Sequence, residues 1–266
     1  PLCPPEAGAK KAVALAGDDV RIVDASTAHR VSPGWDYGFA EMCPGQRDRL
    51  RESRRIANPG CYATGFIAAT RPLVDAGVVK PSARLVSSAI SGYTGGGKAL
   101  VAIHEAGAEP WGAYAFDLDH KHLPEMTTHS GLDVSPIFAP AVGHFAQGMV
   151  VSVLFHYDDA LFDHADGAAI HAALVDHYAD ADAVDVAPLG LPAVKAAGLL
   201  ERDAFLEPCK LNGSNKLDLF VFANDERKTA VVAARLDNLG KGASGAAVQN
   251  LNLMLGLDEH KGLDLH

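Results

Sequence analysis

The sequence predicts an α/β fold in which a parallel sheet comes first and antiparallel strands follow. Residues 20–24 read as a short buried strand, and the loop after it, residues 25–30, carries Ser, Thr, His and Arg. Such a loop is typical of the ligand-facing edge of a parallel sheet. Within residues 112–156, short strand candidates at 137–140 and 149–155 alternate with loops, which favours antiparallel pairing.

The composition indicates a globular protein without the charge pattern of a nucleic-acid or membrane partner. The chain has 266 residues, 48% of them hydrophobic, which is enough for one large domain or two ordinary ones. Charged residues make up 21%, with 26 glycines and 15 prolines, which excludes a disordered acidic chain or a low-complexity polymer. The net charge is −10 and no Lys/Arg stripe is present, so we expect neither a nucleic-acid nor a membrane partner.

The cysteines and the apolar pattern indicate a cytoplasmic location. The four cysteines, at positions 3, 43, 61 and 209, form no CxxC motif and show no close pairing, as expected in a reducing compartment. No apolar run approaches the roughly 18 residues of a membrane span. The first 17 residues carry acids and lysines where a signal peptide would be apolar.

The first elements place one cysteine at the start of a helix. The chain begins without Met, and its first residues read as the end of a strand that runs into a helix at 7–16, so we expect a first βαβ unit to lie upstream. A charged surface helix is predicted at 46–55. After Asn58-Pro59-Gly60-Cys61, apolar residues recur at helical spacing, with Pro72 expected to kink this helix and Gly77 to end it.

The remaining elements alternate between strands and helices. A strand at 84–90 precedes a glycine-rich segment, and the two strands near the C-terminus are separated by five polar residues, which predicts a hairpin. A glycine loop at 240–245 then leads into the last helix. The predicted ranges are helices at 99–106, 165–178 and 246–255, and hairpin strands at 217–223 and 229–236.

Cys61 is the strongest nucleophile candidate. A free thiol of pKa about 8.5 is mostly protonated at neutral pH, but a helix N-terminus and a neighbouring imidazole lower that pKa. Pro59 and Gly60 before it favour a turn that exposes the sulfur. An inert buried cysteine is the competing interpretation, and it is the one we prefer for Cys3, Cys43 and Cys209.

The segment His120-Lys121-His122-Leu123-Pro124-Glu125 is the second candidate. Two imidazoles two residues apart in an extended segment point to one side, and Pro124 is expected to hold Leu123 extended. One imidazole could serve as a general base for a cysteine. Alternatively, His120, His122 and Glu125 could hold a hydrolytic Zn²⁺. A solvated loop is the third interpretation, and spacing alone leaves all three open.

Two glycine motifs match known patterns only in part. Residues 92–98 satisfy G-x-x-x-x-G-K, but Ala99 follows where a P-loop needs a hydroxyl for Mg²⁺. Residues 240–245 satisfy G-x-G-x-x-G, yet no second βαβ unit follows and no strand-end acid is available for a ribose. Both could still approach a cofactor or an anion closely, and both could be plain turns.

These blocks, taken in their order, resemble the N-acetyl-γ-glutamyl-phosphate reductase family in its shorter bacterial form. The resemblance covers nearly the whole chain and depends on residues 24–30, 58–62, 91–98, 120–125 and 240–250. It implies a Rossmann domain joined to an α+β domain like the C-terminal part of glyceraldehyde-3-phosphate dehydrogenase. The family's opening glycine-rich phosphate loop is not in this sequence, so the Rossmann domain is expected to be incomplete.

The resemblance also implies a reaction and a domain division. The reaction is NADPH-dependent reduction of N-acetyl-L-glutamyl 5-phosphate to the 5-semialdehyde through a cysteine thioester, in arginine biosynthesis. Residues 1–60, completed by 241–266, would form the partial NADP-binding domain. Residues 61–240 would form the catalytic and oligomerisation domain of a homo-oligomer, a dimer or a tetramer. No metal is implied.

The same resemblance assigns roles to individual residues. Cys61 would attack the acyl phosphate, and His120 is favoured as the acid/base, with His122 as its substitute or as a substrate contact. The substrate residues would be Arg30 for the phosphate, Asn58 for the acyl group and, more weakly, Gln147. The residues implied for the cofactor are Ser26, Ser91, Gly92, Lys241, Gly242 and Asn250.

Three other functions compete with this interpretation. A related acyl-phosphate reductase, of the aspartate-semialdehyde dehydrogenase type, shares the mechanism but not the substrate. A metal-dependent hydrolase would use His120, His122 and Glu125 and would carry bound Zn²⁺. A non-catalytic nucleotide- or metabolite-binding remnant would bind ligand without turnover.

Overall fold

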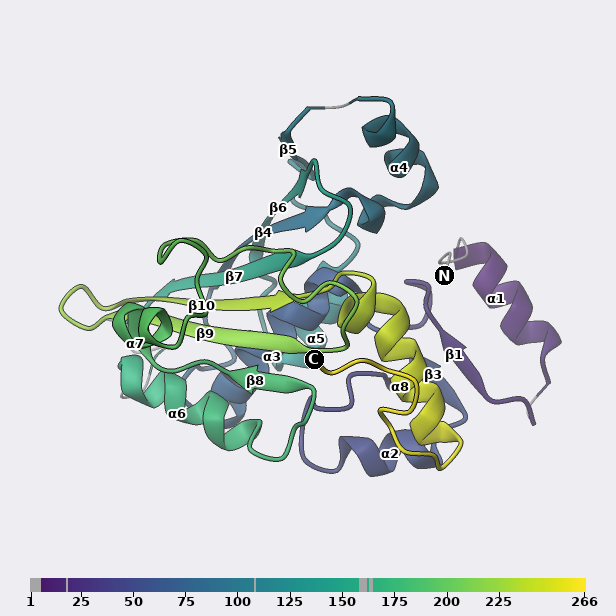
Figure 1. Cartoon of the computed structure of the whole chain (residues 1–266). Helices are drawn as coiled ribbons and strands as arrows, with labels where there is room; N and C mark the ends of the chain where they lie inside the picture. The colour runs from purple at the N-terminus through teal and green to yellow at the C-terminus, as the bar shows by residue number, and fades with distance from the viewer. Residues whose placement is uncertain (1–5, 18, 108, 158–161, 163–164) are drawn as a thin grey trace.

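Two sheets, one small and one large, organise the chain (Figure 1). The computed structural model describes residues 6–17, 19–107, 109–157, 162 and 165–266. Cys3 and the strand end expected at the start of the chain lie outside the described residues. The small sheet has the order β1-β3-β2 and is parallel throughout, as the sequence predicts; its strands are β1 (Ile22–Asp24), β2 (Asp36–Tyr37) and β3 (Arg55–Ala57).

Helices from both ends of the chain accompany the small sheet. The first is α1 (Glu6–Leu15), close to the predicted 7–16, and the C-terminal α8 (Gly245–Met254) packs against α2 (Gln46–Glu52) and β1. The α2 helix is shorter than predicted because the backbone becomes extended at Ser53. Strand β3 begins at Arg55 and pairs with β1. The core between these elements consists of Ala40, Leu50, Ile56, Leu253 and Met254.

The large sheet has seven strands in the order β5-β6-β4-β7-β10-β9-β8. The predicted hairpin is confirmed: β9 and β10 pair antiparallel from Asn224 opposite Thr229 to Leu217 opposite Leu236. The prediction of antiparallel pairing in the middle of the chain is wrong in part, because β4 lies between β6 and β7 and pairs in parallel with β6. The strands are β4 (Val86–Gly92), β5 (Trp111–Ala113), β6 (Ile137–Gly143), β7 (Met149–His156), β8 (Val184–Val186), β9 (Leu217–Asn224) and β10 (Thr229–Leu236).

The helix that begins at Cys61 fills the centre of the molecule. This helix, α3 (Cys61–Asp75), packs against β7 and β10 and against α5 (Leu123–Ser130) and α6 (Gly167–His177). Its apolar side chains belong to the main hydrophobic cluster, which explains why this stretch is helical and buried. As predicted, α3 starts at Cys61 and ends just before Gly77, which has a left-handed backbone conformation (φ 72°). Pro72 lies within the helix.

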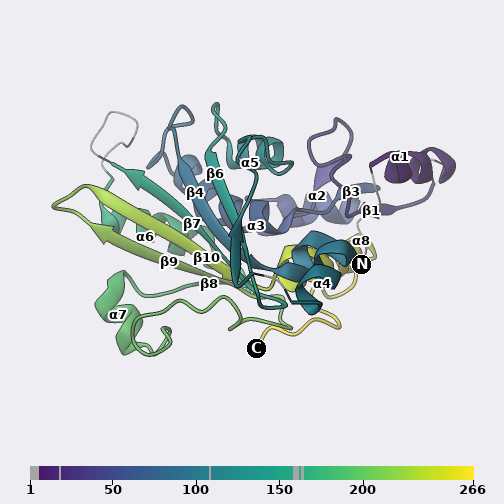
Figure 2. The ribbon, with the colours of Figure 1, turned by 90° about the horizontal axis from the view of Figure 1, so that it is seen from above.

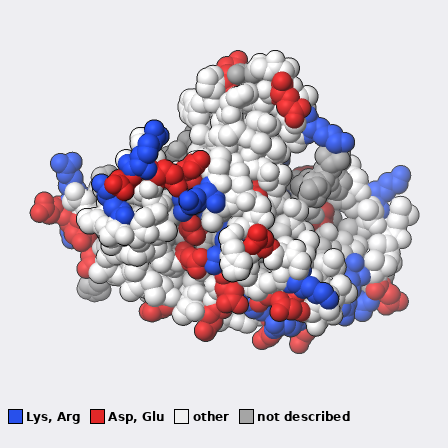
Figure 3. Space-filling view, viewed as in Figure 1, with Lys and Arg blue, Asp and Glu red and all other residues white. Residues whose placement is uncertain are grey.

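A projection stands above the sheet at the end of β4. It consists of the 3₁₀ turn Tyr93–Gly96, helix α4 (Gly97–Glu105) and strand β5. Figures 1 and 3 show it rising above the rest of the molecule, and in the view from above α4 lies in front of α8 (Figure 2). Thr94 anchors its base, because its hydroxyl donates to the carbonyl of Ala146 (2.6 Å) and accepts from Asn238 Nδ2 (3.0 Å). The projection therefore has a fixed lower end beside the C-terminal end of β10.

The prediction of a glycine loop at 240–245 is wrong. Gly240–Ser244 forms a π-helical turn that continues directly into α8. A side chain at Gly240 would collide with the carbonyl of Ser214, so glycine lets the turn pack closely on the neighbouring backbone.

On the other face of the sheet, α7 (Gly190–Ala196) covers β9 and β10. No helix in the described part of the chain is long and apolar enough to span a membrane.

Candidate active site

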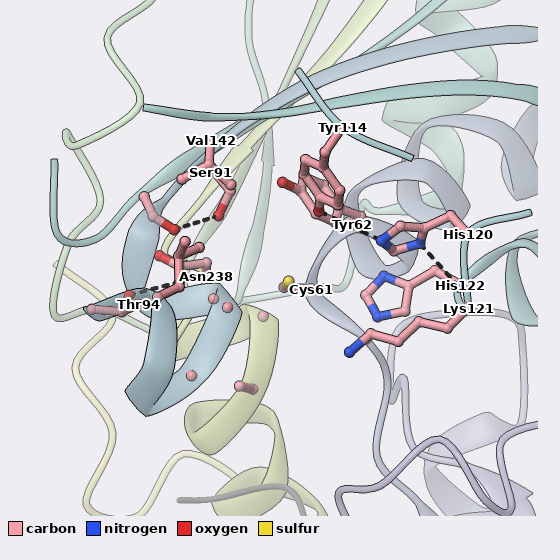
Figure 4. Close-up of a pocket in the computed structure, with 18 of the residues that line it drawn as sticks. Cys61, Tyr62, Ser91, Thr94, Tyr114, His120, Lys121, His122, Val142 and Asn238 are labelled. Atoms are coloured by element: carbon pink, nitrogen blue, oxygen red, sulfur yellow. Dashed lines mark hydrogen bonds between the residues drawn. The ribbon is translucent and has the colours of Figure 1, made fainter. Parts of the chain in front are cut away.

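A cavity of about 910 Å³ collects most of the predicted site residues. Its wall comes from the loop after β1, the N-terminus of α3, the base of the projection, the segment before α5 and the π-helical turn before α8. Figure 4 shows Cys61 between Ser91, Thr94 and Asn238 on one side and the two imidazoles on the other. The volume lies within the usual range for small-molecule sites.

Cys61 is a free, partly exposed thiol on this wall. Burial raises the pKa of the thiol to about 11, although the backbone N–H of Tyr62 and the charge of Arg30 act in the opposite direction. The N–H at the helix N-terminus thus lowers this pKa as expected, but burial outweighs it, so the expected net lowering is wrong for the ligand-free protein. At neutral pH the sulfur carries its proton, so attack on a substrate needs a base.

The two imidazoles lie together, but their segment differs from the prediction. The ring centroids of His120 and His122 are 4.7 Å apart in an edge arrangement. Leu123 is not extended; it begins α5, with Pro124 in the first turn, where proline is favourable because its missing N–H has no helical partner to lose. Burial lowers the pKa of His120 to about 4 and that of His122 well below its usual value, so both rings are neutral at pH 7.

Hydrogen bonds fix the tautomer of His120. Its Nδ1 accepts from the backbone N–H of His122 (3.1 Å), so the neutral ring carries its proton on Nε2. That nitrogen faces the hydroxyl of Tyr114 (3.5 Å), beside Tyr62, whose own hydroxyl donates to the carbonyl of Ala141 (3.0 Å). His120 thus presents a proton donor along the cavity wall (Figure 4).

Glu125 is the centre of a buried polar cluster. The sequence analysis considered this residue only as a metal ligand. Its carboxylate accepts from Arg30 Nη1 (2.6 Å), from the hydroxyl of Tyr37 (2.6 Å) and from the backbone N–H of Gly60 (3.0 Å). Burial raises the pKa of Glu125, while these three donors favour the charged form. Glu125 follows His122 by three residues and lies on the first turn of α5, and this spacing was the one sequence signal that could have placed it beside the imidazole. In the described part of the chain, no group of three or more His, Cys, Asp or Glu residues could hold a metal ion.

Two glycines let the cluster approach Cys61. A Cβ atom at Gly60 would lie 2.5 Å from His122 Nε2, 2.6 Å from Arg30 Nη1 and 2.7 Å from Glu125 Oε1. A Cβ atom at Gly242 would lie 2.8 Å from the Cβ of Cys61. The imidazole, the guanidinium and the carboxylate therefore converge beside the backbone next to Cys61, on a surface that any other residue at position 60 would block.

Several predicted site residues line the cavity. Arg30 and Asn58 are among them, and Asn58 Nδ2 donates to the carbonyl of Ala243 (2.9 Å). Ser91, Gly92 and Gly242 also line the cavity. These positions and the residues around Cys61 are brought together by the fold, although they are spread over almost the whole chain.

Four other predicted residues do not line the cavity, and each has a structural partner instead. Ser26 donates to Asp24 Oδ2 (2.8 Å), and Gln147 Nε2 donates to Asp237 Oδ2 (3.2 Å). Asn250 Nδ2 donates to the carbonyl of Gly38 (2.8 Å) and to Asn58 Oδ1 (3.1 Å), so it supports Asn58 from behind.

Lys241 is the fourth predicted residue that does not line the cavity. It is buried, and its ammonium group donates to both carboxylate oxygens of Glu41 (2.8 Å each) and to Gln249 Oε1 (2.7 Å). It holds the π-helical turn in place.

Comparison with known proteins identifies the class to which this fold and site belong. Residues 61–238 match the family described as semialdehyde dehydrogenase, dimerisation domain, so the chain belongs to the semialdehyde dehydrogenases. Aspartate semialdehyde dehydrogenase II from Vibrio cholerae has a similar fold (TM-score 0.69, 17% identity, 94% of this chain and 77% of that chain).

Several curated proteins that are similar to this chain carry the same name. N-acetyl-gamma-glutamyl-phosphate reductase 2 of Nostoc sp. is 46% identical over 98% of this chain and 83% of its own length. The N-acetyl-gamma-glutamyl-phosphate reductase of Rhizobium johnstonii is 47% identical over 96% and 82%. The chain is a member of the N-acetyl-gamma-glutamyl-phosphate reductase family.

Proposed function

We propose that this protein catalyses the NADPH-dependent reduction of N-acetyl-L-glutamyl 5-phosphate to N-acetyl-L-glutamate 5-semialdehyde, in arginine biosynthesis. It is an oxidoreductase that acts on an acyl phosphate. The observation that carries the proposal is the position of Cys61, at the start of α3 and on a cavity that it shares with two neutral imidazoles and with Arg30, which is paired with the buried Glu125. The sequence similarity to reductases of this name supports the choice of substrate.

The part of the cavity formed by the projection fits a nicotinamide ring and its ribose. Ser91, Gly92 and Gly95–Gly97 line it together with Asn238 and Gly242, so the wall is largely bare backbone. A side chain at Gly92 would collide with the backbone at Ala146, which leaves this surface smooth. We propose that these residues hold the cofactor. Bound NADPH supplies the hydride that reduces the thioester to the aldehyde.

The cavity residues divide the proton transfers between them. We propose that His122 takes the thiol proton as the Cys61 sulfur attacks the acyl carbon, and that the nearby Glu125 carboxylate, 3.9 Å from His122 Nε2, stabilises the imidazolium. The Nε2–H of His120 then donates to the oxyanion of the tetrahedral intermediate. The sulfur–carbon bond forms, and phosphate leaves with the electron pair of the broken carbon–oxygen bond. This division differs from the favoured sequence-based role of His120, since its hydrogen bonds support donation.

The raised thiol pKa predicts how Cys61 reacts in the ligand-free protein. Because only the thiolate is alkylated and the pKa is about 11, we expect iodoacetamide labelling of Cys61 to rise about tenfold per pH unit from pH 7 to 10. Labelling is followed by mass spectrometry of the Cys61 peptide, which separates it from the other cysteines. A rate that already levels off between pH 6 and 7 would contradict the raised pKa and indicate a resting thiolate–imidazolium pair.

Assay of the reverse reaction tests the function and the substrate together. Wild-type protein with N-acetyl-L-glutamate 5-semialdehyde and NADP⁺ is expected to form NADPH only slowly without phosphate and rapidly with it. L-aspartate 4-semialdehyde under the same conditions is the matched control, and a kcat/KM at least about 100-fold lower is expected for it. A preference for the aspartate compound would favour the related reductase, and absence of turnover with both would overturn the proposal.

We further propose how the chain is organised and assembled. Its family match is to a dimerisation domain, and the β4-β6-β7 part of the large sheet leaves Val86, Ile137 and Leu154 exposed on the face away from α3. We propose that this face joins copies of the chain into a dimer or tetramer. We also propose an NADP-binding part at residues 1–60 and 241–266, a catalytic part at 61–240, and a cytoplasmic location, which the cysteine pattern supports.

A further inference from the structure

The described wall of the cavity carries two permanent cations, Arg30 and Lys121. Arg30 is already engaged by the protein. Its Nη1 donates to Glu125 (2.6 Å), its Nε to the carbonyl of Asn58 (3.0 Å) and its Nη2 to the carbonyl of Ala25 (3.3 Å). Because the Glu125 carboxylate offsets the guanidinium charge, this pair contributes little net charge to a bound anion.

Lys121 is in the opposite situation. It lies between His120 and His122 and is exposed on the cavity wall. Figure 4 shows its side chain extended past the ring of His122, with the ammonium group directed into the open space below Cys61. Within the described residues, the ammonium has neither a hydrogen bond nor an ion pair, so its donors and its full charge are available to a ligand.

The chemistry of the proposed substrate matches this free cation. The phosphate group is bonded directly to the carbon that Cys61 attacks, whereas three carbons separate that carbon from the α-carboxylate. Phosphate also gains negative charge as it leaves, and an ammonium group is an effective partner for such a group. The Lys121 ammonium is directed into the same open space as the Cys61 sulfur, so it faces a group that is bonded directly to the carbon that Cys61 attacks.

We infer that Lys121 binds the phosphate group of the acyl phosphate and stabilises the departing phosphate. This inference rests on the proposed function. In the forward direction the carbon–oxygen bond breaks toward a phosphate held by Lys121, as the sulfur–carbon bond forms. In the reverse direction the same ammonium holds inorganic phosphate for attack on the Cys61 thioester, and the thiol recovers its proton from His122.

The test measures how phosphate is used in the reverse reaction. Lys121→Met, which keeps the length of the side chain without its charge, is expected to raise KM for inorganic phosphate about 10- to 100-fold and to change KM for the semialdehyde less than twofold. Lys121→Arg is expected to restore most of the phosphate affinity. Lys195→Met, an exposed lysine in α7, is the matched control and is expected to behave as the wild type.

A second measurement separates this inference from the proposed function. Without phosphate, the wild type and Lys121→Met are both expected to give a burst of NADPH equal to the enzyme concentration, because thioester formation from the aldehyde needs no phosphate. An unchanged KM for phosphate in Lys121→Met, or a rise in KM for the semialdehyde alone, would overturn the role of Lys121. Absence of phosphate-dependent turnover in the wild type would instead overturn the proposed function.

Discussion

Replacing Cys61 with serine is expected to lower phosphate-dependent NADP⁺ reduction by about 10⁴-fold or more. A serine hydroxyl is far less acidic than the thiol, and burial lowers the pKa of His122, the proposed base, well below its usual value. Serine is also no larger than cysteine, so the close contact with Gly242 remains possible and the fold should be kept. Turnover is measured spectrophotometrically, with thermal unfolding as the check on folding.

The matched control for this replacement is Cys43→Ser. Cys43 lies in another part of the chain, where its sulfur contacts Gln46 Oε1 (3.8 Å), and it does not line the cavity. We expect the Cys43 variant to keep activity within about twofold of the wild type. If Cys61→Ser retained more than about 1% of the activity, the thioester mechanism would be wrong.

Replacing Glu125 with alanine is expected to lower the free energy of unfolding by about 3–5 kcal/mol. The change leaves the buried guanidinium of Arg30 without its carboxylate and removes the acceptor of the Tyr37 hydroxyl and of the Gly60 N–H. Activity should fall as well, because these donors position the backbone next to Cys61. Urea unfolding followed by circular dichroism measures the stability.

A double replacement shows whether the loss arises from the uncompensated charge. Arg30→Met with Glu125→Leu removes both charges and keeps most of the volume, so it is expected to be more stable than Glu125→Ala, although inactive. If Glu125→Ala lost less than about 1 kcal/mol, or if the double variant were the less stable of the two, the buried pair would not have the structural importance assigned to it.

The sequence was most informative where structure depends on neighbours along the chain. The start of α3 at Cys61, its end near Gly77 and the hairpin around residues 224–229 follow from turn residues and apolar spacing, which act locally. The pairing of His120 with His122 was also predicted, although the reason given was wrong, since a turn and a helix start bring the rings together.

Features that depend on distant partners were not predictable from one sequence. The family resemblance implied a cofactor role for Lys241, but its ammonium group binds Glu41, which is 200 residues away in the chain, and both side chains are buried. The parallel pairing of β4 with β6 likewise depends on β7 taking the other edge of β4. The raised pKa of Cys61 reflects how completely α3 is packed, a property of the assembled core.

The contact between Gly242 and Cys61 also ties catalysis to the order in which the chain is made. Cys61 leaves the ribosome about 180 residues before the turn that abuts it. Until that turn docks, Cys61 lacks one side of its surroundings. During synthesis the cavity wall around this sulfur is therefore completed only after Gly242 has been made.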